Sequence, residues 1–443
     1  MKEILDDLFT GTVTRCKFIE RATVAGLALP LLGSSLADNL SAQGKGKNKA
    51  PEQAKPQKKP VYSPANIGGG GRIERNFYRD WIETTKVPKF DDPYSVFDVH
   101  NQEVQPWPEI DGRGLYLNFT GNVHMDGVIF EIPSGSGKAL APRKNFFEQV
   151  FIGLGGNGYT LFGEGHRKTR VEWGEGSLFA GPLNVMHRHY NSSAKPARLL
   201  AITSFPLMLQ VFGNMGLINN LNFQFSDRYN GATDYFSKTE RVHKRWDKTN
   251  FVKDIRTSEV VPWLERGGDN ASIFWDMSGN TILEPHMSEF EIGTYKLGHR
   301  HPYEAIILTL NGKGFSIAGK QSLKESDSVK IDWKAGSLVS PPYFWYHQHF
   351  NTGATRARYF AMTEGDFPKR LGIPLQVEQI EADREDPQIK KRFEQELKKT
   401  AVANQRAEVH QHHHKHGPHH DDHDHDDHGG IMFAQNDWKR RLI

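Results

Sequence analysis

Cysteine is almost absent from this chain, since Cys16 is the only one among 443 residues. A single cysteine excludes a disulfide framework and any cysteine-rich zinc module. Long hydrophobic runs are also missing. The apolar stretch 22–32 is shorter than the roughly 20 residues that a membrane-spanning helix needs. The sequence therefore predicts no integral membrane span, while its 37% hydrophobic share is enough to build globular domains.

Positive charge is not spread over the body of the chain. The net charge is +3, and six lysines with one glutamate lie between Gly44 and Pro60. The remainder of the chain is therefore slightly negative. Nucleic-acid binding needs basic residues clustered on a folded face, so we expect no nucleic-acid partner.

The N-terminus is typical of an export signal. Arg15, Lys17 and Arg21 flank the start of the apolar run, and 35–37 has the small-x-small pattern of a signal-peptidase site. The stretch 14–20 resembles a twin-arginine signal, with Cys16 in the place of the second arginine. We expect a signal peptide at 1–37, a basic flexible linker at 38–75, and export to the periplasm or cell envelope by the twin-arginine or Sec route. A cytoplasmic N-terminal helix is the alternative.

The body of the chain contains a duplicated unit. Residues 96–107 match 252–263 at an offset of 156, as between Trp107 and Trp263. The offset persists at Glu148/Glu304 and Gly156/Gly312, and becomes 160 at Trp173/Trp333, His187/His347, His189/His349 and Arg198/Arg358. We therefore predict two homologous domains, 76–215 and 251–370, separated by an insert or linker at 216–250.

Each unit has the pattern of short β-strands. The apolar run 305–310 ends in Asn311-Gly312-Lys313-Gly314, which is a hairpin signal. Many short strands with glycine and proline turns predict an all-β fold of two tandem jelly-roll barrels. One helix is expected within 371–402. Asp386 can cap it, Pro387 can take its first position, and the apolar stripe is Ile389, Phe393 and Leu397.

A histidine cluster is predicted in the second unit. His299 and His301 lie two residues apart before the run 305–310, so on an extended chain both point into the barrel. His347 lies on a later strand. Three neutral imidazoles converging from neighbouring strands can hold Fe(II), Mn, Zn, Ni or Cu. The alternative is that these are ordinary surface or core histidines.

These residues resemble the cupin superfamily, and the duplication makes the chain similar to a bicupin. The first cupin motif has a glycine, His-x-His, a glutamate and a second glycine; the second motif is matched by Pro342, His347 and Asn351. Ala305 occupies the usual glutamate position, and Glu304 lies one residue away. In this departure the chain resembles gentisate- and salicylate-type dioxygenases, whose cupins hold Fe(II) with three histidines. The resemblance implies two double-stranded β-helix barrels and a small aromatic or enolic substrate.

The resemblance also implies roles for single residues. His299, His301 and His347 are the expected metal ligands. Three residues are candidate catalytic groups: His349 as a base or substitute ligand, Glu304 as a fourth ligand, and Arg358 as a partner for a substrate carboxylate, although its match to Arg198 favours a structural role. An aromatic set either walls a pocket or packs the barrel: Tyr303, Tyr343, Phe344, Trp345 and Phe350.

The first unit lacks histidine in 142–148 and retains only His187 and His189. We expect an empty, structural barrel, with weak metal binding through these histidines and Glu148 as the alternative.

The tail 403–443 holds ten histidines and five aspartates within 410–428. It cannot bury a core, and we expect it either to bind divalent metals multivalently or to be a solvated linker. Two functions follow for the whole chain. The leading hypothesis is an exported non-heme Fe(II) dioxygenase with a small-molecule substrate, and the alternative is a non-catalytic metal-binding or storage cupin that uses the tail. A homo-oligomer is left open.

Overall fold

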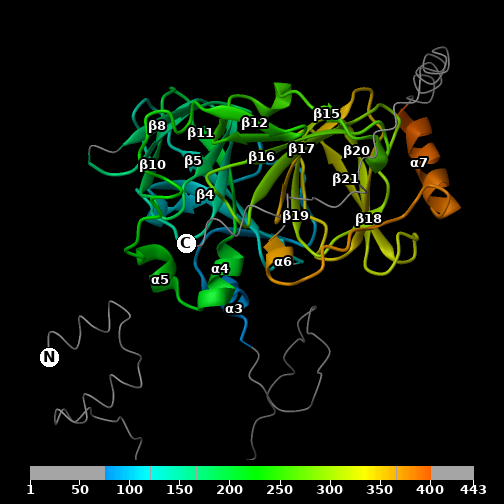
Figure 1. The fold of residues 1–443 in the computed structure, drawn as a ribbon, viewed down its shortest axis with the longest axis horizontal. Helices are drawn as coiled ribbons and strands as arrows, with labels where there is room; N and C mark the ends of the chain where they lie inside the picture. Colours follow the sequence, from blue (N-terminus) through cyan, green and yellow to red (C-terminus); the bar gives the residue numbers. More distant parts are fainter. Residues whose placement is uncertain (1–74, 120, 166–167, 366, 401–443) are drawn as a thin grey trace, which may run out of the picture. The chain divides into compact units, whose positions relative to one another are not determined.

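The computed structural model describes residues 75–119, 121–165, 168–365 and 367–400 (Figure 1). Three predicted segments lie outside these residues: the signal peptide, nearly all of the linker, and the histidine-rich tail. The prediction that the termini are disordered concerns the same undescribed residues. Within the described ranges, no helix is long and apolar enough to cross a membrane.

The first barrel follows the short helix α3 (Phe77–Thr84) and consists of two sheets. The larger sheet has the order β1-β4-β5-β11-β6-β9-β14 with β3 on β4, and the smaller has the order β10-β7-β8. The bounds are β1 (Lys89–Asp92), β3 (Gln105–Trp107), β4 (Gly112–Phe119), β5 (Asp126–Ile132), β6 (Gln149–Gly155), β7 (Gly158–Phe162), β8 (Thr169–Trp173), β9 (Leu178–Gly181), β10 (His187–Asn191) and β11 (Ala197–Thr203), with a 3-10 turn η1 (Pro108–Ile110).

The second barrel also consists of two sheets. The larger has the order β12-β13-β16-β17-β24-β19-β22-β2 with β15 on β16, and the smaller has the order β21-β20-β23-β18-β25. The bounds are β15 (Val261–Pro262), β16 (Ala271–Asp276), β17 (Glu284–Phe290), β18 (His299–Arg300), β19 (Ala305–Asn311), β20 (Lys313–Gly319), β21 (Ser328–Lys334), β22 (Leu338–Val339), β23 (Tyr346–Asn351), β24 (Ala357–Thr363) and β25 (Glu378–Gln379), with 3-10 turns η2 (Ile255–Thr257) and η3 (Leu264–Arg266). The prediction of an all-β fold of two tandem barrels is confirmed.

The segment between the barrels is structured. It contains α4 (Phe205–Phe212), α5 (Met215–Asn220), β12 (Thr239–His243) and β13 (Trp246–Thr249). Strand β13 runs parallel to β16 and pairs with it. The predicted insert 216–250 therefore adds two strands to the large sheet of the second barrel.

Two short strands are exchanged between the barrels. Strand β2 (Ser95–Val96) lies between β1 and β3 of the first barrel in the chain but pairs with β22 of the second. Its repeat counterpart β14 (Phe251–Val252) lies between β13 and β15 of the second barrel but pairs with β9 of the first. The predicted boundaries, 76–215 and 251–370, thus place each strand with the barrel that it does not join.

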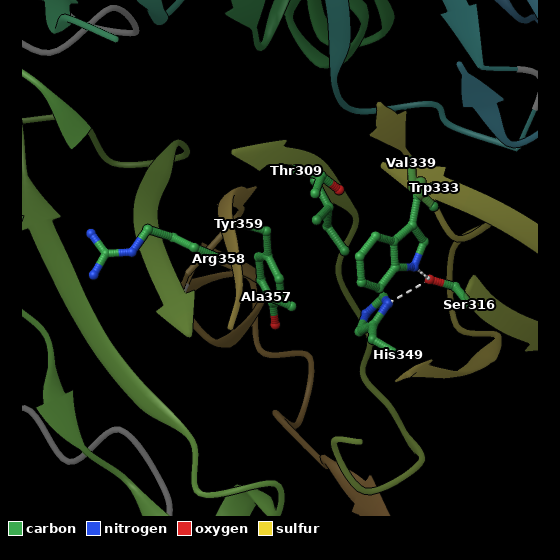
Figure 2. A pocket seen from close by; sticks show the side chains of 9 residues that line it. Thr309, Ser316, Trp333, Val339, His349, Ala357, Arg358 and Tyr359 are labelled. Carbon is green, nitrogen blue, oxygen red and sulfur yellow. Dashed lines mark hydrogen bonds between the residues drawn. The ribbon is translucent and has the colours of Figure 1, made fainter. Parts of the chain in front are cut away.

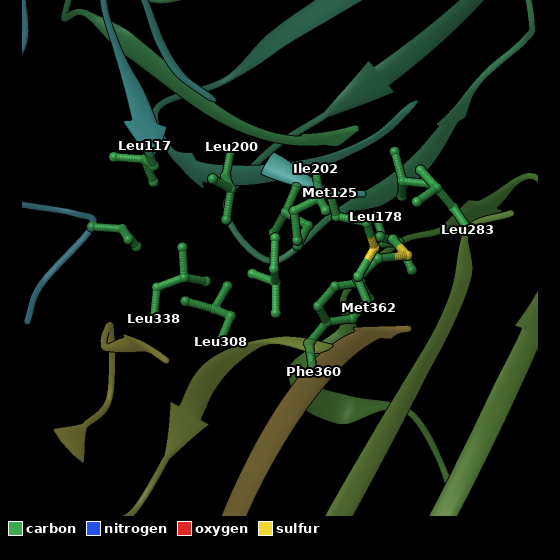
Figure 3. Packing of buried hydrophobic residues seen from close by; sticks show 14 of the residues in the cluster. Leu117, Met125, Leu178, Leu200, Ile202, Leu283, Leu308, Leu338, Phe360 and Met362 are labelled. Atoms are coloured by element: carbon green, nitrogen blue, oxygen red, sulfur yellow. The ribbon is translucent and has the colours of Figure 1, made fainter. Parts of the chain in front are cut away.

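The two larger sheets bury both of their faces. One face of each sheet contributes to a shared core between the barrels (Figure 3), which includes Leu117, Leu200 and Ile202 of the first barrel and Leu308, Phe360 and Met362 of the second. Alternate residues along a strand point to the opposite face of the sheet. Those on the second face line the barrels themselves, such as Phe151, Leu199 and Ala201 in the first and Ala305, Ile307 and Ala361 in the second. Strands buried on both faces read as continuous apolar runs, which explains the sequences of β6 and β19.

The C-terminal helix confirms the predicted cap and stripe. Helix α7 (Pro387–Thr400) is shorter than the predicted range 371–402 and follows a short helix α6 (Phe367–Arg370). The Oδ1 of Asp386 accepts the Gln388 N–H at 2.9 Å. The stripe Ile389, Phe393 and Leu397 is buried in one cluster with Phe315 and Phe350. The helix therefore covers the small sheet of the second barrel.

Two buried glutamates at equivalent repeat positions join the barrels. The Glu148 carboxylate accepts backbone N–H groups of Thr281, Ile282 and Leu283 at 2.7, 2.8 and 3.0 Å. The Glu304 carboxylate reciprocally accepts those of 123–125 at 2.5 to 3.2 Å. We call these two contacts the carboxylate latches. Each one satisfies the backbone of a loop in the opposite barrel, where no sheet partner is available.

Replacing Glu148 by alanine should weaken the whole described body. Glu148 is 2% exposed and also pairs with Arg228 at 2.9 Å. Its loss leaves backbone donors unpaired and removes the carboxylate partner of the Arg228 guanidinium, so we expect the free energy of unfolding to fall by about 3–5 kcal/mol. Denaturant unfolding followed by circular dichroism measures this change.

The matched control is Glu175→Ala, because Glu175 is 53% exposed and pairs with Arg256 at the surface. There we expect a loss below about 1 kcal/mol. Equal losses in the two variants would contradict a stabilising role for the latch.

Candidate metal centre

The structure brings His299, His301 and His347 together inside the second barrel. His299 on β18 and His347 on β23 are register partners in an antiparallel pair, and His301 follows two residues after His299. One ligand nitrogen from each of the three lies within 4.8 Å of the others. The three side chains are 3 to 6% exposed. We call this set the three-histidine cluster.

Backbone carbonyls fix the orientation of all three rings. The Nδ1 atoms of His299, His301 and His347 lie 2.9, 2.9 and 3.0 Å from the carbonyl oxygens of Leu297, Tyr303 and Trp345. A carbonyl oxygen can only accept, so Nδ1 carries the proton in each ring. The Nε2 lone pairs are then free to bind a metal, which is the usual arrangement of metal-binding histidines.

Burial keeps the rings neutral. It lowers the pKa of His347 to about 4, with Arg266 and Lys296 acting in the same direction. Burial likewise holds the pKa of His299 and His301 well below the ordinary value, and the neighbouring cationic groups lower both further. Metal binding needs deprotonated imidazole nitrogens. The donor set therefore fits a divalent first-row metal bound by three nitrogens, with coordination positions left for other ligands.

His349 lies beside the cluster but is not a member of it. Its Nδ1 is 2.7 Å from Ser316 Oγ. The same Oγ accepts a hydrogen bond from Trp333 Nε1 at 3.1 Å. Figure 2 shows these side chains around a small cavity of about 10 Å³. The His347 and His349 ring centroids are 5.6 Å apart. His349 is thus placed next to the ligand set, and its predicted catalytic role stays a prediction.

Glu304 faces away from the three-histidine cluster. It precedes β19, where Ala305 and Ile307 line the barrel and Ile306 and Leu308 face the other barrel. Glu304 is expected on the same face of the strand as Ile306 and Leu308, the face toward the other barrel. Its carboxylate accepts backbone N–H groups of 123–125 in one of the carboxylate latches. It is not among the residues that group with the three histidines. The structure thus gives Glu304 a positioning contact between the barrels instead of the place of a fourth ligand.

Arg358 also lies outside the cluster. Its Nε donates to Glu289 Oε2 at 2.7 Å, and Nη1 donates to the carbonyls of Arg256 and Ser258. Figure 2 shows Arg358 extending away from His349. Arg198 repeats the pattern in the first barrel, with Glu131 and the carbonyls of His100 and Gln102 as its partners. These equivalent contacts support the structural alternative for Arg358.

The aromatic set is divided between the site and the core. Tyr303 stacks on His301 with ring centroids 3.8 Å apart and an interplanar angle of 8°. Phe350 is fully buried and packs against Phe393 of α7. Phe344 is 37% exposed and lies under the Arg300 guanidinium. Of these rings, Tyr303 is therefore the one in direct contact with the cluster.

Sequence reasoning missed Lys296. Its side chain is 5% exposed, its Nζ donates to Tyr359 Oη at 2.6 Å, and it lowers the pKa of His299, His347 and His349. A lysine three residues before a ligand has no signal of burial in the sequence. Lys296 lies in the irregular segment before β18, next to the isolated bridge between Tyr295 and Phe350, so strand alternation does not predict its direction.

Similarity to known proteins is limited to solved structures, since no protein-family model and no curated protein matches the chain. One match is an oxalate decarboxylase of Lactobacillus farciminis in a formate complex, at 12% identity over 64% of this chain and 88% of that chain, with a TM-score of 0.43. Another is a mutant of salicylate 1,2-dioxygenase from Pseudoaminobacter salicylatoxidans, at 12% identity over 60% and 81%, with a TM-score of 0.43. Oxalate decarboxylase of Bacillus subtilis matches at 13% over 72% and 88%, with a TM-score of 0.42. At these values the likeness carries no functional information.

His124 should make stability depend on pH. Its Nδ1 is 2.9 Å from Glu364 Oε1, and Glu364 accepts the Glu304 N–H at 2.8 Å. Burial of the ring acts to lower the pKa, but Glu304 and Glu364 outweigh it and raise the pKa of His124 from 6.5 to about 9. The resulting stabilisation is complete below about pH 6.5 and is lost as the pH rises through 9. Burial also raises the pKa of Glu304 from 4.5 to about 7, and the stabilisation from that shift is lost at lower pH, as the pH rises from about 4.5 through 7.

We expect urea unfolding to show a loss of stability from pH 6.5 to 9 that is smaller in His124→Gln. His243→Gln serves as the control, because His243 lies in the exposed strand β12. A pH profile of His124→Gln that coincides with that of the unchanged chain would disprove the effect.

The cluster predicts which histidine substitutions remove metal. In a chain truncated after Arg406, which lacks the histidine-rich stretch, His347→Ala should lose nearly all bound metal, because two remaining nitrogens hold a divalent ion weakly. His349→Ala should keep the metal, since its Nδ1 is held by Ser316 outside the ligand group. Elemental analysis after gel filtration gives the stoichiometry. Metal retained by His347→Ala, or lost equally from both variants, would contradict this assignment.

Proposed function

We propose that this chain is an exported metal-dependent oxidoreductase, an Fe(II) dioxygenase that acts on a small aromatic or enolic substrate. The observation that carries the proposal is the three-histidine cluster: three buried, neutral imidazoles with Nδ1 bound to carbonyls and no carboxylate in the group. When bound, Fe(II) supplies a redox-active Lewis acid with open positions for substrate and O₂. Mn, Ni, Cu and Zn are the other metals that such a ligand set accepts.

Charge balance supports a chelating, anionic substrate. Three neutral imidazoles leave the full charge on a divalent metal, and Lys296 is a further buried donor beside it. Deprotonated oxygens of the substrate would neutralise this charge, since an uncompensated buried charge is costly. Tyr303 offers a ring face beside His301, against which a planar substrate could stack.

His349 is suited to hold a proton next to the substrate. Trp333 donates to Ser316 Oγ, so the Ser316 hydroxyl can donate its own proton to His349 Nδ1. The neutral ring then carries its proton on Nε2. Burial and neighbouring cationic groups keep the pKa of His349 well below the ordinary value. A neutral imidazole in this place can donate a hydrogen bond to an anionic substrate.

Export is part of the proposal and rests on the segment 1–37, with the periplasm or cell envelope as the destination. A non-catalytic metal-binding or storage cupin is the second candidate function. The observation that favours it is the set of ten histidines in 410–428, which offers many more ligands than the cluster in the barrel.

Metal content and O₂ uptake separate the two functions. The chain truncated after Arg406 should carry about one Fe per chain and consume O₂ with at least one member of a panel of catechols and hydroxybenzoates. The double variant His299→Ala with His301→Ala should lose both properties. An oxygen electrode and elemental analysis measure the two quantities on the same samples.

Lys296→Met adds a probe of substrate binding. It should raise KM about fivefold, because a buried hydrogen-bond donor is lost, while iron content stays the same. Metal well above one per chain that disappears on truncation, with no O₂ uptake on any compound, would instead establish metal storage.

A further inference from the structure

The first barrel has its own set of residues at the positions of the three-histidine cluster. At the repeat offset of 156, Arg143 corresponds to His299 and Asn145 to His301; at the offset of 160, His187 corresponds to His347. The structure supports this correspondence, because Arg143 bridges His187 across the sheet as His299 pairs with His347. A guanidinium therefore stands where the second barrel has a metal-binding imidazole.

The Arg143 guanidinium has no acidic partner among the described residues. It lies over the rings of Phe130 and Trp107, 4.9 and 5.6 Å from their centroids. Burial lowers the pKa of Arg143 to about 10, so the side chain is still charged at neutral pH. The charge acts on the barrel interior, where it adds to burial in lowering the pKa of His187 and His189. A positive charge held among aromatic rings without a counter-ion is costly.

His189 supplies a second donor to the same interior. Trp173 Nε1 donates to Thr160 Oγ1 at 3.0 Å, and Thr160 Oγ1 is 2.8 Å from His189 Nδ1. The Thr160 hydroxyl can therefore donate to Nδ1, which places the ring proton on Nε2. That Nε2 is buried and has no hydrogen-bond partner, in a side chain that is only 1% exposed. Buried polar atoms in native structures are nearly always paired, so an unpaired one indicates a missing ligand.

We propose that the first barrel is a metal-independent binding site for a small carboxylate. The planar fork of Arg143 matches the two carboxylate oxygens, and His189 Nε2–H donates to one of them. Phe130 and Phe151, whose centroids lie 6.2 and 4.7 Å from that of His189, form apolar walls for the rest of the ligand. Arg143 as a residue is partly exposed, so part of its side chain or backbone borders solvent.

The site differs from the one that sequence reasoning expected. A barrel without the His-x-His pair was predicted to be empty, because the prediction considered metal ligands alone. In a metal site the positive charge comes from the ion, whereas here it is part of the chain. This second site is independent of the proposed function, because it requires neither a metal nor the three-histidine cluster.

The test uses the full chain after treatment with a chelator, so that no metal in the second barrel can bind the probe. Sodium formate and sodium benzoate are titrated calorimetrically at constant ionic strength in chloride. We expect saturable binding of at least one of them with one site per chain, and affinity at least tenfold lower in Arg143→Met. Arg170→Met is the matched control, because Arg170 lies in the same barrel on an outward position of β8, and its affinity should equal that of the unchanged chain.

His189→Leu removes the Nε2–H donor but keeps the Arg143 charge, and it should bind the probe several-fold more weakly, which preserves the test if Arg143→Met does not fold. Circular dichroism confirms that each variant is folded. The proposal is overturned if neither probe binds saturably to the unchanged chain, if Arg143→Met binds as tightly as Arg170→Met, or if chloride competes as well as the carboxylates do. Failure of the dioxygenase proposal would leave these titrations unaffected.

Discussion

The burial of both faces of the two large sheets is the constraint on which the rest of the structure depends. In β19 and β24 one parity packs against the opposite barrel and the other parity lines its own barrel. A polar side chain on the outward parity has no access to water and must find partners in the opposite barrel. Glu148 and Glu304 meet this requirement by accepting backbone N–H groups of the facing loops. The same constraint removes Glu304 from the metal cluster, because Ala305 holds the inward position beside it.

The side chains that point into the second barrel determine the chemistry of the site. Burial keeps the three histidines neutral, and the carbonyls of Leu297, Tyr303 and Trp345 fix which nitrogen of each ring is free. The glutamates of the carboxylate latches point toward the facing barrel and do not reach these free nitrogens. The absence of a carboxylate from the cluster, among the residues that the structure describes, then means that a bound divalent ion retains its charge. Because the ligand set is neutral, a bound divalent ion would favour anionic oxygen donors from outside the chain, as in the proposed substrate class.

Much of this was predictable from periodicity. The repeat offsets indicated two equivalent barrels, the i, i+2 spacing placed His299 and His301 on one side, and the spacing of four residues identified the buried stripe of α7. Three features were beyond such reasoning because they depend on contacts between distant segments. Strands β2 and β14 cross between barrels, Glu304 binds loop 123–125, and Lys296 turns inward from an irregular backbone. Arg143 differs from these, because an arginine in 142–148 carries no metal-ligand signal, and the ligand pattern of the first unit therefore predicts only an empty barrel.

The two barrels share part of the hydrogen-bond network around the site. Trp173, Thr160 and His189 repeat the hydrogen bonds of Trp333, Ser316 and His349. The Nδ1 of His187 lies 3.1 Å from the Val185 carbonyl, as that of His347 does from Trp345. Two of the three ligand positions differ, where Arg143 and Asn145 stand for His299 and His301. Each barrel can therefore hold one positive centre in an aromatic-lined interior. In the second barrel it would be an ion bound by imidazoles, and in the first it is a guanidinium. The two proposals therefore assign one shared framework to two kinds of site, a metal centre in the second barrel and a metal-free anion site in the first.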